Sequence, residues 1–382
     1  MALLDRRDQQ RKAGDIVPPN TDRHVEGRPV ESAAKLDRLR ALLRDRGYAA
    51  AALHARRNFA WLTAGGDNHV LQASENGVAT LLVNATDAVV LTAVNEAPRM
   101  RDEEVSGLPL EVVAVPWEQP GAVSDEIRAR AGGPVADDGD LEADLWPMRA
   151  TLTPAEQERY RWLGSRTARA MTAVLAATRA GDTEMVVGER LALELATDGI
   201  LAPVLLVASD ERILRYRHPI PKPKPIDTSV MLITCAERGG LMVAITRFAW
   251  LGTRPDAETM RRFEAVNRIH VAFRGATQPG RMLSEVLADG VAAYEAAGFR
   301  DEWRLHHQGG PIGYQGRESV ATPTNEARVH DGMAFAWNPS ITGTKAEDTF
   351  IVRSDGGHEI VTRDPHWPSG PDGEPAVWMS TP

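Results

Sequence analysis

The sequence predicts an α+β protein in which a smaller α/β domain precedes a larger domain, whose curved, mainly antiparallel sheet is flanked by helices. Helix-like and strand-like patterns alternate up to about residue 150. The phrase Thr153-Pro154-Ala155-Glu156 then forms a capping box at the start of a long amphipathic stretch, which indicates a domain boundary. Beyond it, polar clusters stand at the ends of apolar strand-like runs.

The first domain is expected over residues 31–150, after a polar N-terminal arm at 1–30 that we expect to be mobile. Ser32 can cap a helix over 33–46, which Gly47 ends. The elements expected after it are a strand at 49–53, a strand at 56–66 that enters a glycine turn, a hairpin of 78–83 and 88–91, a strand at 111–115, a helix at 123–131 and a strand at 135–136.

The second domain is expected over residues 151–382. Its helices are predicted at 154–179, 183–197, 256–275 and 284–297, with Gly298 as a stop for the last. Strands are predicted at 203–208, 229–235, 241–249, 333–338, 348–353 and 358–362. The proline-punctuated segment that begins at Asp364 should lie across the surface.

Composition excludes several functions. The 382 residues carry a net charge of −9, so an extended nucleic-acid-binding surface is not expected. No apolar run is long enough for a membrane span, and the charged opening does not resemble a secretory signal, so we expect a cytoplasmic protein. The single cysteine, Cys235, excludes an internal disulfide and a thiolate-rich metal site.

The stretch HHQGGPIGYQGRE at 306–318 is the strongest candidate for the floor of a pocket. It contains His306, His307, Gln308, an Arg317-Glu318 pair and four glycines, which let a backbone approach a ligand closely. Adjacent imidazoles can shuttle a proton near neutral pH, and a guanidinium can grip a carboxylate. The alternative is a glycine turn with one histidine capping a carbonyl.

Four further clusters supply candidate residues, and each also has a purely structural interpretation. His218 precedes Pro219, which favours an extended backbone that can aim the ring across a cleft, although a solvated loop histidine is equally ordinary. Arg247 lies within a strand, where a structural ion pair would explain it. Asn338 ends a strand, and Glu347 precedes the core-like run that begins at Thr349, where a loop salt bridge explains it less well.

In order and spacing, these phrases resemble the creatinase, methionine aminopeptidase and prolidase superfamily, peptidase family M24. The phrases are Arg217-His218-Pro219, Ile245-Thr246-Arg247, the His/Gly-rich stretch, Asn338-Pro339 and Glu347-Asp348-Thr349. The resemblance implies the "pita-bread" fold for residues 152–362 and a creatinase-type N-terminal domain before it. The set also resembles a bacterial subgroup described as Xaa-Pro aminopeptidase-like.

The resemblance also implies where two divalent metals would bind, and this chain departs from that pattern. The family's two aspartates should fall at Ile233 or Thr234 and at Ala244, its histidine at Gly310 and its first glutamate at Asn338. Only Glu347 matches. One carboxylate cannot offset about four positive charges, so we expect no catalytic metal and no other cofactor.

What remains resembles creatinase, the metal-free hydrolase of this fold. His218 matches its acid/base histidine, Glu347 a glutamate that binds the substrate's nitrogenous group, and Arg317 an arginine that grips the substrate carboxylate. We therefore predict metal-independent hydrolysis of a C–N bond in a small amino-acid- or amidine-like substrate, with His218, His306, His307 and Glu347 as catalytic residues. The candidate substrate-binding residues are Arg317, Glu318, Asn338, Arg247, Gln308 and Tyr314.

Three other interpretations stay open: a catalytically inactive binding module, a lyase, isomerase or cyclase acting on a biosynthetic intermediate, and a metallo-aminopeptidase with unusual ligands. Apolar residues at the expected ligand positions, Ala244 and Ile233, are typical of a binding module that no longer needs the metals. The histidines, Asn338 and Arg317 instead indicate a pocket with new polar groups. The resemblance further implies a homodimer acting on a small molecule with a carboxylate, with no nucleic acid or membrane as a partner.

Overall fold

The structure is a computed structural model that describes residues 21–252, 254–371 and 373–380. Most of the predicted N-terminal arm, residues 1–20, lies outside the described residues. The arm was predicted to extend to residue 30, and this is wrong for residues 21–30, because helix α2 spans Thr21–Arg46 and includes Pro29. Ser32, predicted as a helix cap, is instead buried inside α2.

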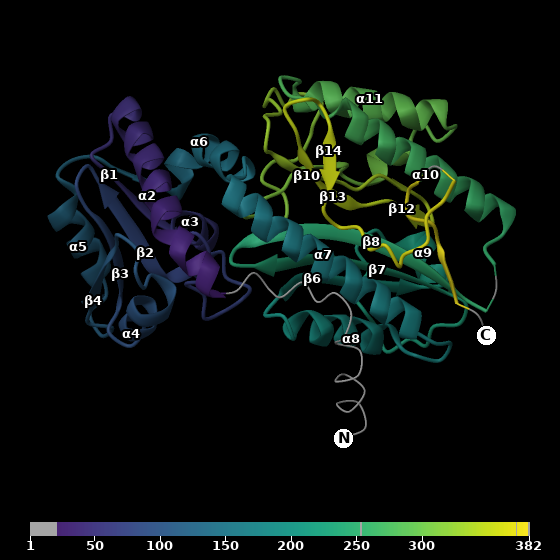
Figure 1. The fold of residues 1–382 in the computed structure, drawn as a ribbon, viewed down its shortest axis with the longest axis horizontal. Helices are drawn as coiled ribbons and strands as arrows, with labels where there is room; N and C mark the ends of the chain where they lie inside the picture. The colour runs from purple at the N-terminus through teal and green to yellow at the C-terminus, as the bar shows by residue number, and fades with distance from the viewer. Residues whose placement is uncertain (1–20, 253, 372, 381–382) are drawn as a thin grey trace.

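The N-terminal domain is a five-stranded sheet in the order β4-β3-β2-β1-β5, drawn at the left of Figure 1. The β1–β2 and β2–β3 pairs are antiparallel, which confirms the predicted hairpin, and the β3–β4 and β1–β5 pairs are parallel. The strands are β1 Ala50–Ala55, β2 Asn76–Asn84, β3 Ala88–Ala93, β4 Glu111–Val115 and β5 Val135–Asp137. The helices are α2, α3 Arg56–Leu62, α4 Ala97–Arg99, α5 Ala122–Ala131 and α6 Asp138–Ala150, with a π-helical turn η1 at Met100–Glu104.

Helix α3 corrects the strand predicted at 56–66. Its residues 58–62 are all buried, a pattern that a half-buried strand with alternating faces would not give. Phe59 and Trp61 favour strands by intrinsic propensity, but they lie on helical backbone here and both are buried in the same core cluster. Thr63 closes the helix by donating its hydroxyl to the Phe59 carbonyl at 2.7 Å.

The structure confirms the capping box predicted at Thr153–Glu156. The capping box is present: Thr153 Oγ1 accepts from the Glu156 N–H at 3.2 Å, and Glu156 accepts from the Thr153 N–H at 2.7 Å. Glu156 also accepts a hydrogen bond from Lys35 of α2 at 2.6 Å, so the capping box is linked to the first domain.

Glu31 of α2 pairs with the same lysine and with Arg159 of α7. Burial raises the pKa of Glu31, but Arg159 and Lys35 outweigh this effect and lower that pKa to about 2.

The C-terminal domain contains two four-stranded sheets, β15-β8-β7-β6 and β14-β13-β10-β9, and a short β11-β12 hairpin. The strands are β6 Leu201–Ser209, β7 Ser229–Arg238, β8 Leu241–Leu251, β9 Gly309–Pro311, β10 Ala334–Trp337, β11 Ser340–Ile341, β12 Thr344–Lys345, β13 Asp348–Val352, β14 His358–Ile360 and β15 Trp378–Ser380. The helices are α7 Pro154–Ala177, α8 Glu184–Ala196, α9 Glu211–Arg215, α10 Ala257–Ala276 and α11 Leu283–Ala296, with a 3₁₀ turn η2 at Glu302–Leu305.

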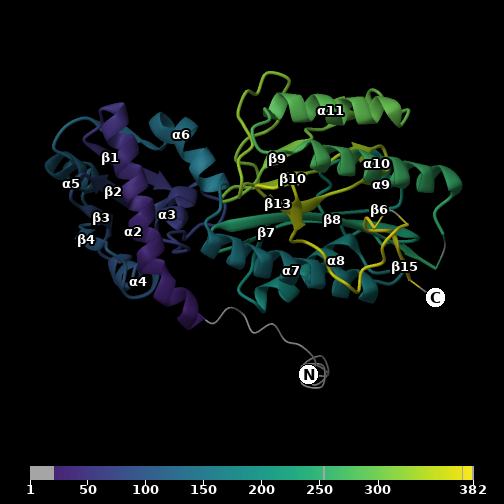
Figure 2. The ribbon, with the colours of Figure 1, turned by 45° about the horizontal axis from the view of Figure 1, so that its top comes forward.

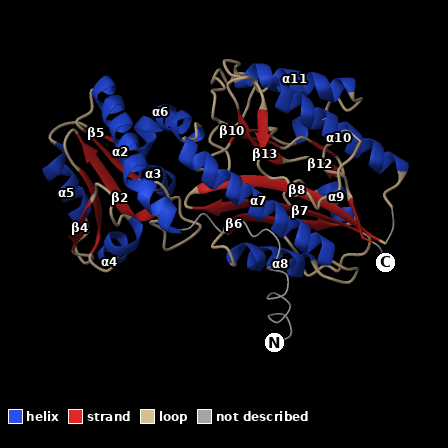
Figure 3. Cartoon of the chain, viewed as in Figure 1, coloured by secondary structure: helices blue, strands red, loops and turns tan. Residues whose placement is uncertain are grey.

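These elements form layers, with α7 and α8 on one side of β6–β8 and with α10 and α11 on the far side of the second sheet (Figures 2 and 3). The two sheets meet where β8 lies beside β13. Thr246 and Glu347 form a bridge there, and the Thr349 hydroxyl accepts from the Ala244 N–H at 2.8 Å and donates to its carbonyl at 2.9 Å. Side chains at this seam therefore come from segments about 100 residues apart. None of the described helices combines the length and apolarity that crossing a bilayer requires.

Candidate active site

Three histidines from two separate loops come together beside the seam. The Nε2 atoms of His218 and His306 lie 2.9 Å apart, which is hydrogen-bonding distance, and their rings meet edge to face with centroids 4.8 Å apart. His307 stacks on His306 at a centroid distance of 4.4 Å. We call His218, His306 and His307 the histidine trio. It confirms the expected meeting of the His218 loop with the His/Gly-rich stretch.

The electrostatic surroundings keep the histidine trio uncharged. Burial lowers the pKa of His306 to about 3 and that of His307 to about 4, and it also lowers the pKa of His218. Lys345 lowers all three further, since a nearby cation disfavours imidazolium, and Glu347 opposes it. A neutral imidazole has one N–H and one lone pair, and the Nε2–Nε2 hydrogen bond engages the lone pair of either His218 or His306. The remaining lone pairs are available for a base or a ligand at neutral pH.

Glu347 is the centre of a buried charge cluster next to the histidine trio. Its Oε1 accepts from Arg317 at 2.8 Å, and its Oε2 accepts from the Thr246 hydroxyl at 2.7 Å and pairs with Lys345 Nζ at 3.1 Å. Burial by itself raises the pKa of Glu347, but Lys345 and Arg317 outweigh burial, so this pKa lies well below its usual range. We call Arg317, Lys345 and Glu347 the charge triad. Its net charge is +1.

Extended backbone explains how the charge triad is assembled. Lys345 and Glu347 are two residues apart, so their side chains share one side of the chain, while Asp348 points to the other. Lys345 pairs with Glu347, and Asp348 pairs with Arg247 instead. Lys345 and the supporting Thr246 were missed as site residues, although the alternation at 345–347 carried the signal for Lys345.

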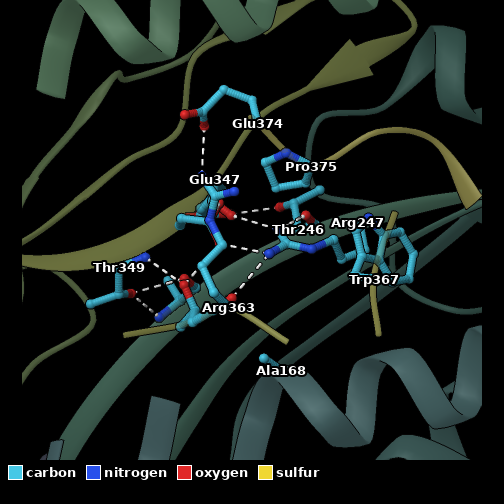
Figure 4. A network of polar contacts seen from close by, with 12 residues as sticks. Ala168, Thr246, Arg247, Glu347, Thr349, Arg363, Trp367, Glu374 and Pro375 are labelled. Carbon is cyan, nitrogen blue, oxygen red and sulfur yellow. Dashed lines mark hydrogen bonds and ion pairs between the residues drawn. The ribbon is translucent and has the colours of Figure 1, made fainter. Parts of the chain in front are cut away.

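Arg247 lies in a network of polar contacts that Figure 4 draws together with Thr246 and Glu347, and it donates to the Glu347 carbonyl at 3.3 Å. It donates to Asp348 at 2.7 Å and to the Thr362 carbonyl at 3.0 Å, and its guanidinium lies over the Trp367 ring at 5.7 Å. A buried guanidinium that is fully engaged in this way has no free edge for a substrate. The predicted substrate-binding role of Arg247 is therefore corrected to a structural ion pair.

Glu318, Tyr314 and Gln308 are also engaged elsewhere, which corrects their predicted substrate-binding roles. Glu318 accepts from Arg149 at 2.8 Å in an ion pair that is buried on both sides. The Tyr314 hydroxyl donates to Glu156 at 2.6 Å at the domain junction. The Gln308 amide nitrogen donates to the carbonyls of Trp303 and His306 at 2.9 and 2.7 Å, which fixes the backbone that presents the histidine trio.

Several polar atoms at the site are buried without a hydrogen-bond partner among the described residues. They include Nδ1 of His306, Oδ1 of Asn338, which follows β10, and Nε of Arg317. A buried, unpaired polar atom usually indicates a place for water or a ligand. Asn338 and Arg317 therefore stay candidates for substrate binding, together with the two donor hydrogens of Lys345 that Glu347 does not use.

Comparison with known proteins identifies the family. The model of "Metallopeptidase family M24" matches residues 158–354, more than half of the chain, so the protein belongs to this family and has its pita-bread fold. No curated protein matches the sequence at a significant level.

Solved structures agree with this fold. A dipeptidase from Pyrococcus horikoshii superposes with a TM-score of 0.73 at 19% identity, covering 90% of this chain and 99% of its own. Dipeptidase PepE from Mycobacterium ulcerans gives 0.72 at 17% identity, covering 92% and 99%. The N-terminal domain of the FACT complex subunit SPT16 from Cicer arietinum gives 0.66 at 14% identity, covering 88% and 95%. At these identities the likeness concerns the fold alone.

The residues present do not fit the pair of metals that the family name implies. Ala244 offers no side-chain donor, and the Thr234 hydroxyl donates to the Val204 carbonyl at 2.9 Å. Gly310 has φ +154°, and a Cβ built there would lie 2.3 Å from the Ser319 carbonyl oxygen, so the backbone itself excludes a histidine. The one matching carboxylate, Glu347, already pairs with two cations. These residues therefore do not supply the ligand set of a metal pair.

Proposed function

We propose that this protein is a metal-independent hydrolase of the creatinase type, which cleaves a C–N bond in a small amino-acid- or amidine-like substrate bearing a carboxylate. The observation that supports it is the 2.9 Å contact between Nε2 of His218 and Nε2 of His306, next to the charge triad. The proposed site then contains His218 as the acid/base group, Arg317 as the group for a substrate anion and Glu347 as the group for a substrate nitrogen.

In the proposed reaction, neutral His218 takes a proton from a water molecule while the oxygen of that water attacks the carbon of the C–N bond. The resulting imidazolium gives this proton to the leaving nitrogen as the bond breaks, so one water is consumed and two products form. General acid–base catalysis of this kind contributes about 10²–10⁴-fold to a rate. His306, hydrogen-bonded to His218, holds the ring orientation that both proton transfers need.

The charge triad would orient the substrate. The free Nε of Arg317 and the remaining donors of Lys345 suit a carboxylate, while Glu347, ionised and anchored by Thr246, can accept from a substrate N–H. Because Glu347 offsets one of the two cations, the site has one unbalanced positive charge for one carboxylate. This favours monoanionic substrates over neutral peptides.

The test starts with a thermal-shift screen of guanidino, ureido and cyclic amino acids, each compared with its methyl ester. Any binder is then assayed for hydrolysis with chelator present. His218→Ala is expected to lower kcat by about 10²-fold or more with an unchanged melting temperature. His330→Ala, an exposed histidine outside the site, is the matched control and should retain activity. Full activity in His218→Ala would remove His218 from the mechanism.

A binding module is the second candidate, and a specific observation favours it. Ala244 is fully buried and its backbone is clamped by Thr349, as expected of a position that packs rather than reacts. In this case a carboxylate ligand would still bind through Arg317 and Lys345, but it would be recovered unchanged. Product analysis of a bound ligand after long incubation separates the two candidates.

Assembly as a homodimer and a cytoplasmic location complete the proposal. Size-exclusion chromatography with light scattering would test the first, since a monomeric mass at micromolar concentration would contradict it.

A further inference from the structure

The histidine trio has a geometry that acid–base chemistry does not require. Each of its three rings offers one nitrogen, and these nitrogens all lie within 4.8 Å of one another. We propose that His218, His306 and His307 form a mononuclear site for a divalent transition metal such as Zn²⁺. The site would hold one metal through imidazoles alone, in contrast to the carboxylate-rich metal pair that the family name implies.

The donor chemistry suits such an ion. Zn²⁺ binds histidine nitrogen at about 2.0–2.1 Å, so tetrahedral ligation needs nitrogens roughly 3.4 Å apart. The nitrogens of His218 and His306, 2.9 Å apart, would have to separate slightly, and any pair near the 4.8 Å limit would have to move closer. His218 and His307 are exposed residues outside helices and strands, so their side chains have room to move. Imidazole donors favour Zn²⁺, Co²⁺, Ni²⁺ and Cu²⁺ over Mg²⁺, Ca²⁺ and Mn²⁺.

The second nitrogen of His306 also lacks a partner. Nδ1 of His306 is buried and has no hydrogen-bond partner within the described part of the chain. Because Nε2 of this ring faces His218, an ion held at Nε2 would leave Nδ1 to a separate water molecule or ligand group. The backbone of His306 is also held in place, because its carbonyl accepts a hydrogen bond from the Gln308 side-chain amide at 2.7 Å.

The charge triad defines what else the site would hold. With three neutral ligands, a bound Zn²⁺ keeps its full charge beside a triad of net charge +1. An anion in the fourth position, such as hydroxide or a substrate carboxylate, would offset this charge. We therefore expect affinity to be moderate without a small anion and to increase when a carboxylate ligand is added.

One consequence rests on the proposed function. A metal on Nε2 of His218 would fix the ring proton on Nδ1 and leave this ring no lone pair to act as a base, so binding should inhibit hydrolysis. The metal-binding measurement itself needs no substrate. If the protein binds metal but shows no hydrolysis, only the proposed function fails; if it hydrolyses a substrate but binds no metal, only the present proposal fails.

The experiment is a Co²⁺ titration of chelator-treated full-length protein, followed by visible d–d absorption. The expected result is one Co²⁺ per chain with the intense bands of four-coordinate cobalt, competed away by Zn²⁺. His307→Ala, which removes an exposed ligand, should weaken binding about 10-fold or more, and His306→Ala likewise. His330→Ala should bind as the parent protein does.

Several results would overturn the proposal. These are the absence of four-coordinate bands, a stoichiometry of two, or equal affinity in His307→Ala and His330→Ala. Because His307 is exposed, its variant should melt at the parent temperature, and circular dichroism checks this before each titration.

Discussion

Replacing Glu347 by Gln isolates the role of the charge triad in holding the site together. The Glu347 side chain is 3% exposed and lies 2.8 Å from Arg317, 3.1 Å from Lys345 and 2.7 Å from the Thr246 hydroxyl. Glutamine has nearly the same shape but no charge, so it leaves two largely buried cations without a counter-ion. Removing one partner of a buried pair costs about 3–5 kcal/mol, and we expect Glu347→Gln to lower the free energy of unfolding by this amount.

The assay is urea denaturation followed by tryptophan fluorescence, with Glu359→Gln as the matched control. Glu359 also pairs with two arginines, Arg161 and Arg353, but these are 41% and 51% exposed, so its loss should cost less than about 1 kcal/mol. The double variant Glu347→Gln/Lys345→Met should recover part of the loss, because it removes one unpaired cation. If Glu347→Gln lowered the free energy of unfolding by no more than Glu359→Gln does, within error, the reasoning would be refuted.

Three more predictions follow from single features of the structure. Arg149→Met leaves the fully buried Glu318 unpaired and should lower stability by about 3–5 kcal/mol in urea denaturation; a loss below about 1 kcal/mol would contradict this. The pKa of Glu31 is depressed from 4.5 to about 2, so its stabilisation is present above pH 4.5 and is lost as pH falls toward 2. That loss should reach about 3 kcal/mol, at about 1.4 kcal/mol per pKa unit. Melting curves recorded against pH should show this acid destabilisation in the parent protein and not in Glu31→Gln. Equal acid sensitivity of the two proteins would contradict the prediction. Gly310→Ala should cost about 1–3 kcal/mol, since its Cβ would lie 2.3 Å from the Ser319 carbonyl oxygen, and an unchanged melting temperature would show that the backbone relaxes freely.

Local sequence signals accounted for much of the fold. The Thr153–Glu156 capping box, the hairpin around residues 84–88 and the Asp256 cap, which accepts from the Thr259 N–H at 2.7 Å, all depend on residues a few positions apart. Local rules failed at α3, because core packing outweighed the strand propensity of Phe59 and Trp61.

The site was predictable in composition but not in pairing. The meeting of His218 with His306 bridges 88 residues, and no local pattern encodes it; the resemblance to a family fold supplied it. Periodicity distinguishes the two faces of a strand but does not say which face meets the site. Arg247 and Glu347 were therefore both candidates, and only the structure assigns Arg247 to the network with Asp348 and Trp367.

At the positions where the resemblance places metal ligands, this chain differs from the family pattern in backbone as well as in side chains. Gly310 cannot accept a side chain in its present conformation, and the Glu347 carboxylate is neutralised by cations that a metal pair would repel. Restoring one ligand by mutation would therefore not restore a metal pair. After such a mutation, the imidazole, guanidinium and ammonium groups of the site are expected to keep their present contacts.

Elemental analysis of the purified full-length protein after loading with excess Mn²⁺, Co²⁺ or Zn²⁺ tests the central claim most directly. The account predicts at most one metal per chain, Co²⁺ or Zn²⁺ rather than Mn²⁺, and its loss in His306→Ala. Two metals per chain at full occupancy, retained in His306→Ala, would contradict it.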